Sequence, residues 1–268
     1  MDGTRRAHLN LIDSSRLLFA LDPDAEIEDE PGWLLGAGSA SHPVISNAAF
    51  RRDDGADPEE LLAHAKEFFG ARGRGFSVWC RDGQDEDGDI LAATDAAGLQ
   101  FVYAMPEMTL GAPVETPALP PGAELRRLTA GEEAEDYWKV AIASYASLGF
   151  PPEVFAGYSD HSGLLAGNVA AFLAYLDGEP VAIALTIVSD GVAGVYWVGT
   201  LEQARGKGLG RAVTAAATNA GFELGANLAS LQASPMGKPI YEAMGYETVF
   251  EYRLMMVSPP QARNERYR

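Results

Sequence analysis

The chain has 268 residues, a hydrophobic content of 47% and a net charge of −18. Its length and hydrophobic content are sufficient for two globular domains. The acidic charge argues against nucleic-acid binding, because that binding needs a surface that neutralises phosphates. No segment approaches the roughly 20 apolar residues that span a bilayer. The start of the chain lacks a secretory apolar region, and the single Cys80 excludes an intramolecular disulfide. We therefore expect a cytoplasmic protein that binds neither nucleic acid nor a membrane.

The N-terminal half shows few clear elements. Residues 58–69 predict an amphipathic helix with apolar residues at core spacing. A strand, a helix and a second strand are expected after it, at residues 75–80, 90–97 and 100–105. The glycines of residues 70–75 lie between a helix and a strand, so they offer no helix start to a phosphate. They predict a helix cap and a turn.

Prolines crowd the middle of the chain, with four of them between Pro113 and Pro121, followed by Gly122. This composition predicts a semi-rigid linker. We expect an accessory domain over residues 1–115, a linker at 116–122, a second domain over 123–258 and a tail at 259–268.

The C-terminal half is more regular. A helix over 129–148 and a short helical piece are expected first. Three strands should follow, and the dipeptides Asp177-Gly178 and Asp190-Gly191 between them favour tight antiparallel hairpins. The remaining expected elements are a helix at 209–224, a strand at 227–233, a helix at 235–244 and a strand at 246–257. This order predicts a mixed α+β sandwich, not a doubly wound parallel sheet.

A basic glycine loop, Arg205-Gly206-Lys207-Gly208-Leu209-Gly210-Arg211, joins the strand expected at 192–200 to the next helix. Its glycines allow the backbone to turn and approach a ligand closely. The helix start that follows offers unpaired N–H groups and the positive end of the helix dipole. The loop therefore predicts a pyrophosphate site. Its spacing matches neither a Walker A loop nor the dinucleotide fingerprint G-x-G-x-x-G.

The Arg-x-x-Gly-x-Gly pattern in a strand–loop–helix context resembles the GNAT superfamily of acyl-CoA-dependent N-acyltransferases, over about residues 123–257. The resemblance implies that the loop binds the pyrophosphate of acetyl-CoA, the co-substrate. The four histidines stand alone without metal-ligand spacing, so no metal site is expected. The resemblance also implies that Val198, Gly199 and Thr200 offer backbone groups to the pantetheine arm. An N–H near Val198 would stabilise the oxyanion. The N-terminal half would then be a degenerate GNAT-like copy in a tandem arrangement.

The segment from Ser234 to Tyr246 is similar to the late helix of the same family. By that resemblance, Tyr241 is the residue that protonates the departing thiolate, and its alternative role is an aromatic anchor for the helix. Many relatives carry Asn near the end of the preceding strand, where this chain has Gln232, Ala233 and Ser234. Ser234 would bind the cofactor weakly or cap the helix, and capping is favoured.

Several assignments stay open at this stage. One of Tyr196 and Trp197 should face the cleft, and the other the core. The general base is unassigned, although Glu202 is near in sequence. Six aromatic residues fall where the family places its acceptor site, and most should be core: Tyr137, Trp138, Tyr145, Phe150, Phe155 and Tyr158.

We expect an N-acetyltransferase that moves an acetyl group from acetyl-CoA to a primary amine, on either a small molecule or a peptide. The alternative is a non-catalytic CoA-binding or amine-sensing regulatory protein, which needs the glycine loop but not Tyr241. A nucleotide-binding regulator of unrelated fold would have a parallel sheet and conflicts with the hairpins. Whether the chain forms a homodimer is open.

Overall fold

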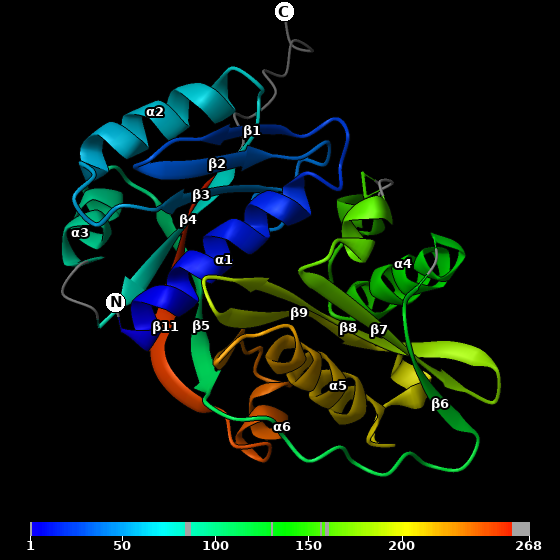
Figure 1. Ribbon diagram of the computed structural model, residues 1–268. Coiled ribbons are helices and arrows are strands. Elements are labelled where there is room, and N and C mark those ends of the chain that lie inside the picture. The colour runs from blue at the N-terminus through cyan, green and yellow to red at the C-terminus, as the bar shows by residue number, and fades with distance from the viewer. Residues whose placement is uncertain (1, 84–86, 130, 156, 159–160, 259–268) are drawn as a thin grey trace, which may run out of the picture.

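The computed structural model describes residues 2–83, 87–129, 131–155, 157–158 and 161–258. Figure 1 shows two halves of mixed helix and strand, with the N-terminal helix lying between them. In the described part of the chain, no helix has the length and apolar character needed to cross a bilayer.

The N-terminal half contains more structure than its sequence predicts. The four expected elements are present, and the turn after the first of them includes Gly73 at a φ of 62°. The last strand continues past Pro106, because the proline carbonyl still accepts a hydrogen bond from the N–H of Ala233 (2.9 Å). The elements of this half are α1 (Gly3–Phe19), β1 (Glu26–Asp29), β2 (Trp33–Ala37), β3 (Asn47–Arg51), α2 (Pro58–Gly70), β4 (Phe76–Asp82), α3 (Gly88–Ala96) and β5 (Gln100–Leu110).

The sequence did not predict helix α1, and the reason is physical. Its Asp2 cap accepts a hydrogen bond from the N–H of Arg5 (2.8 Å), but the face that it buries includes His8, Asn10 and Ser14. Polar residues on the buried face hide the apolar period that marks an amphipathic helix.

The C-terminal half follows the predicted order closely. The hairpins form as expected, with Asp177 and Gly178 at φ 52° and 88°, and Asp190 and Gly191 at 48° and 71°. The helix expected at 235–244 is shorter than predicted. The elements are β6 (Ala123–Arg127), α4 (Gly131–Ala146), η2 (Pro152–Phe155), η3 (His161–Leu165), β7 (Val169–Leu176), β8 (Glu179–Ser189), β9 (Val192–Thr200), η4 (Glu202–Ala204), α5 (Leu209–Glu223), β10 (Leu228–Gln232), α6 (Lys238–Glu242) and β11 (Glu247–Val257).

The two halves exchange their last strands. Among the described residues, eleven strands form one sheet in the order β1-β2-β3-β4-β11-β5-β10-β9-β8-β7-β6. Strand β5 leaves the N-terminal half and pairs antiparallel with β10 of the C-terminal half. Strand β11 in turn pairs antiparallel with β4 of the N-terminal half, and β11 and β5 pair with each other at the centre. The sheet is therefore continuous across both halves.

The connectivity of the two halves matches around this centre. The series β3–α2–β4–α3–β5 has the same order of elements as β9–α5–β10–α6–β11. In both, the first two strands pair parallel and the next pairing is antiparallel to the strand from the other half. The N-terminal half thus repeats the topology of the C-terminal half.

Helices cover both faces of the C-terminal sheet. Helix α5 packs closely against β7, β8 and β9, and a Cβ on Gly221 would lie only 2.2 Å from that of Ala193. Helices α1 and α4 pack against β8 and β9, over a core rich in aromatic residues. The proline-rich segment is held against α5, because the Asn219 side chain bonds both the N–H (2.8 Å) and the carbonyl (2.9 Å) of Val114.

Candidate active site

Strands β9 and β10 form a fork. They pair only through Leu228–Ser230 and Val192–Gly194, and beyond these residues no pairing joins them. On the other edge of β9, a bulge sets two residues, Trp197 and Val198, opposite the single residue between Ile183 and Leu185 of β8. Trp197 adopts a φ of 53° in this bulge. On its β10 edge, the backbone of β9 from Val198 to Thr200 therefore borders an open space, while Gly199 and Thr200 still pair with β8 on the other edge.

The start of α5 lies at the mouth of this fork. Gly208 is the N-cap at a φ of 80°, no side chain caps the helix, and the first turn has no acidic residue. Gly206 is also at positive φ, 75°. The first N–H groups of a helix have no intrahelical partner, so this end of α5 presents donors and positive dipole to the fork.

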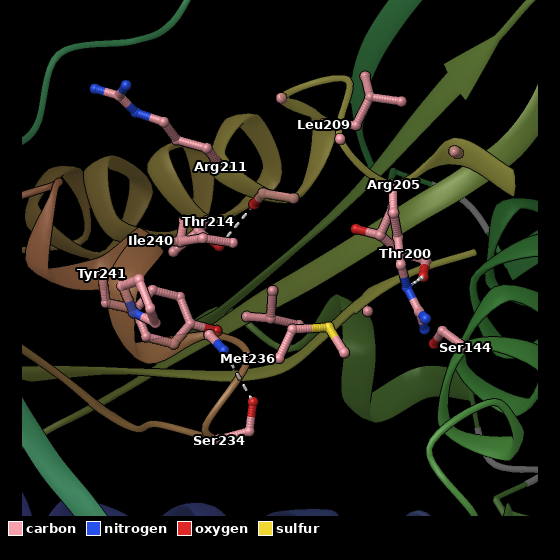
Figure 2. Close-up of a pocket in the computed structure, with 18 of the residues that line it drawn as sticks. Ser144, Thr200, Arg205, Leu209, Arg211, Thr214, Ser234, Met236, Ile240 and Tyr241 are labelled. Atoms are coloured by element: carbon pink, nitrogen blue, oxygen red, sulfur yellow. Dashed lines mark hydrogen bonds between the residues drawn. The ribbon is translucent and has the colours of Figure 1, made fainter. Parts of the chain in front are cut away.

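A cavity of about 540 Å³ occupies the fork. Figure 2 shows it between the start of α5, the strand end at Thr200, and the segment that carries Ser234 and Tyr241. Of the site residues predicted from sequence, only Lys207 does not line it, and that side chain is exposed. The predicted residues in the lining are Val198, Gly199, Thr200, Arg205, Gly206, Gly208, Leu209, Gly210, Arg211, Ser234 and Tyr241.

The lining also includes residues from the α4 and α6 regions that the sequence had not assigned to the cofactor site. Helix α4 contributes Ser144 and Tyr145, and the turn after it contributes Leu148; of these, only Tyr145 had been considered for an acceptor site. The α6 region adds several apolar side chains, including Met236 and Ile240. No local motif marks these positions, because helix packing alone brings them to the fork.

Arg205 reaches toward α4 in this structure (Figure 2). Its guanidinium donates to the hydroxyl of Ser147 (2.5 Å) and to the carbonyl of Thr200 (3.2 Å). The side chain therefore ties the glycine loop to the helix that forms the opposite wall.

Tyr241 is 7% exposed, and no described residue forms a hydrogen bond with its hydroxyl. Burial raises the pKa of Tyr241 to about 12. The phenol consequently keeps its proton at neutral pH, so it holds a proton that it can donate to a departing thiolate.

Tyr196 and Trp197 both pack on the aromatic core beneath α1 and α4, because the bulge in β9 interrupts the alternation of its side chains. Tyr196 is buried under α1 and donates a hydrogen bond to Asn10 (2.8 Å). Trp197 packs against an aromatic cluster beside the cavity. Among the six aromatic residues considered for the acceptor site, Tyr145 alone lines the cavity, whereas Tyr137, Trp138, Phe155 and Tyr158 are buried in the core.

Ser234 accepts a hydrogen bond from the N–H of Gly237 (3.1 Å). This bond closes the turn before α6, whose N-cap is Gly237 itself. Ser234 thus stabilises the approach to the helix and also borders the cavity.

The lining of the cavity contains arginines but no Asp, Glu or His. Glu202, on η4, is exposed and outside this lining. The site as described can bind an anion and donate a proton, while a proton acceptor must come from outside the lining.

Comparison with known proteins identifies the family that this site resembles. The sequence model of the acetyltransferase (GNAT) domain matches residues 119–232. The C-terminal half is a GNAT domain. The chain is accordingly an acyltransferase. No match was found among curated proteins.

Solved structures match almost the whole chain. A GCN5-related N-acetyltransferase from Kribbella flavida has a TM-score of 0.70 at 24% identity, with 94% of this chain and 95% of that chain covered. One from Sphaerobacter thermophilus has a TM-score of 0.62 at 14% identity, with 92% of both chains covered. A tandem GNAT protein from the clavulanic acid biosynthesis pathway has a TM-score of 0.62 at 15% identity, with coverage of 97% and 95%. At these identities the likeness concerns the fold, which is a mixed α/β GNAT fold in two domains.

Proposed function

We propose that the protein transfers an acetyl group from acetyl-CoA to a primary amine in the cavity between β9 and β10. The observation that carries this proposal is the uncapped, glycine-rich start of α5, which opens into a fork where Tyr241 holds an unpaired phenol. The acceptor is a small molecule or a peptide amine.

The residues of the cavity fit the parts of acetyl-CoA. The free N–H groups at the start of α5 suit the pyrophosphate, and Arg205, Lys207 and Arg211 supply positive charge near it. The edge of β9 that faces β10 has no partner strand from Val198 to Thr200, and it suits the amide groups of the pantetheine arm. The apolar side chains of the α6 region shield that arm from water.

The chemistry follows from this placement. When the amine attacks the thioester carbonyl, negative charge develops on oxygen, and a backbone N–H at the bulge near Val198 stabilises it. The carbon–sulfur bond then breaks, and the hydroxyl of Tyr241 gives its proton to the leaving thiolate. The amine also loses a proton, which passes to water or to a carboxylate outside the cavity lining.

An acceptor screen tests this proposal. Purified protein with acetyl-CoA and a panel of primary amines should release free CoA, which a thiol reagent detects, and the acetylated amine should appear by mass spectrometry. Acetyl-CoA at 100 times its Kd should stabilise the fold by about 2.7 kcal/mol, seen as a rise in Tm. A rise in Tm with NAD or ATP but not with acetyl-CoA would contradict the proposal.

A further inference from the structure

Acyl transfer to an amine needs a proton acceptor, and the cavity lining supplies none. Its side chains include no carboxylate and no imidazole. The exchanged strand β5, which the N-terminal half contributes, runs beside the fork on the far side of β10.

One face of β5 packs on the aromatic core that forms part of the cavity wall, although no residue of β5 is in the lining itself. Its alternating residues Tyr103, Met105 and Glu107 point to the same side of the sheet, and the first two pack on the aromatic core that also includes Tyr145. Burial raises the pKa of Tyr145, and the nearby phenols of Tyr241 and Tyr103 raise it further. This face of β5 therefore lies next to a wall of the cavity.

Glu107 is the acidic residue on that face. It is 0% exposed, and no ion pair involves it within the described part of the chain. Its Oε2 accepts a hydrogen bond from the amide of Gln232 (2.6 Å), whereas its Oε1 is buried without a partner among the described residues. A buried carboxyl without a cation is costly, so its retention calls for an explanation.

The position of Glu107 in the sheet brings it to the fork. Its register partner Gln232 is the last residue of β10, and Ser234, two residues later, lines the cavity. Gln232 lies beyond Ser230, where the pairing of β10 with β9 ends. Glu107 is therefore level with the open part of the fork, and β10 lies between its strand and the cavity.

The groups that face Glu107 carry no charge near neutral pH. The nearest are Ser230 and Gln232 from β10, Tyr196 from β9 and Tyr252 from β11. Helix α1 covers the two tyrosines with Asn10, Ser14 and a His8 whose pKa burial lowers to about 3, and the charges of Asp13, Arg81 and Asp87 act on those phenols. Burial raises the pKa of Glu107 to about 8, and the polar groups of β10 oppose that rise only in part. A carboxyl that titrates in this range can both take up and release a proton at the pH where an enzyme works.

We propose that Glu107, supplied by the N-terminal half, accepts the proton that the attacking amine loses, an inference that rests on the proposed acetyl transfer. A bridging water carries the proton across the layer between the amine and the carboxylate. The nitrogen–carbon bond forms, the carbon–sulfur bond breaks, Tyr241 protonates the thiolate, and Glu107 takes the amine proton. Exchange with solvent then returns a proton to Tyr241 and removes one from Glu107.

The test measures release of CoA from acetyl-CoA with the amine that gives the fastest turnover in the screen. In the unaltered protein, kcat should rise with pH through about 8. Glu107→Gln keeps the shape and the bond to Gln232 but cannot accept a proton. It should lower kcat by about 10²–10⁴-fold and remove the rise, with acetyl-CoA affinity unchanged. Glu107→Asp should lower kcat but retain a rising limb.

The control is Glu223→Gln, the same substitution at an exposed position of α5, which should leave kcat and its pH profile unchanged. If Glu107→Gln folds and shows the same kcat and the same rise of kcat with pH as the unaltered protein, the proposal is overturned and Glu107 is a structural residue. If that variant does not fold, unaltered kcat in Glu107→Asp would overturn it equally. Should the unaltered protein release no CoA with any amine, acetyl transfer itself fails and the role of Glu107 fails with it.

Discussion

Arg81 and Asp87 form a buried ion pair in the N-terminal half, where the C-terminal half has its open cavity. The guanidinium lies 2.6 Å from Oδ1 of Asp87, both side chains are 2% exposed, and Arg81 also contacts Asp54 at 2.6 Å. Strands β3 and β4 pair only through Ala48–Ala49 and Ser77–Val78, so they diverge as β9 and β10 do. The ion cluster joins the loops that follow these two strands and closes the fork.

This closure predicts one acetyl-CoA site in each chain. The start of α2, the counterpart of α5, is also unsuitable for a pyrophosphate, because Asp57 caps it and Glu59 and Glu60 lie in its first turn. Isothermal titration of the full chain with acetyl-CoA should therefore give a stoichiometry of one. A value of two would show that the N-terminal fork opens to the ligand.

The glycine loop can be tested with a matched pair of substitutions. Gly208 is at positive φ with open space where a Cβ would lie, so Gly208→Ala should cost only the backbone strain of about 1–2 kcal/mol. Gly208→Asp adds a carboxylate where the pyrophosphate is expected and should abolish acetyl-CoA binding. Equal affinity in the two folded variants would argue that the loop is only a turn.

Tyr241→Phe tests the proton donor. The ring and its packing remain, but the hydroxyl is lost, so kcat should fall by about 10²–10⁴-fold with little change in acetyl-CoA affinity. Tyr241→Ala should in addition destabilise the fold by roughly 3–5 kcal/mol as a core truncation. Full activity in Tyr241→Phe, with the chemical step shown to limit the rate, would remove Tyr241 from the mechanism.

The raised pKa of Glu107 makes stability depend on pH. The folded state holds this proton up to about pH 8, whereas the ordinary pKa is 4.5. Below pH 4.5, this proton contributes its full stabilisation to the free energy of unfolding. As pH rises from 4.5 to about 8, that contribution is lost at up to roughly 1.4 kcal/mol per pH unit. Glu107→Gln removes this loss, so its Tm relative to the unaltered protein should increase from pH 5 to pH 8. The Glu223→Gln control should show no such trend.

The buried ion cluster of Arg81, Asp54 and Asp87 should contribute strongly to the stability of the N-terminal half. Arg81→Ala leaves Asp87 buried without its partner, and removal of one member of such a pair costs about 3–5 kcal/mol. The control is Arg126→Ala, because Arg126 pairs with Glu124 on the surface and such pairs contribute about 0–1 kcal/mol. Chemical denaturation compares the two variants. Equal losses of stability would mean that the Arg81 cluster contributes no more than a surface pair.

The sequence by itself determined the turns and loops whose conformation depends on a few neighbouring residues. Asp177-Gly178 and Asp190-Gly191 specify hairpins through their backbone preferences, and the glycines at 206, 208 and 210 specify the loop before α5. Together they predict the order of the C-terminal elements and the loop side of the cavity, because the residues of each motif act on their own backbone or on the next few residues. The remaining predicted lining residues, Val198–Thr200, Ser234 and Tyr241, came from the resemblance to a family.

The tertiary structure decided what depends on distant pairing. The exchange of β5 and β11 brings together segments more than 100 residues apart, and no local motif distinguishes these strands from ordinary neighbours. The pairing of Glu107 with Gln232 follows from this exchange, and the contact of Asn10 with Tyr196 follows from the packing of α1 on the C-terminal half. The closure of the N-terminal fork by Arg81 depends on how β4 and the loops after β3 and β4 pack together. A buried polar residue takes its partner and its pKa from the packing around it, and only the folded chain determines that packing.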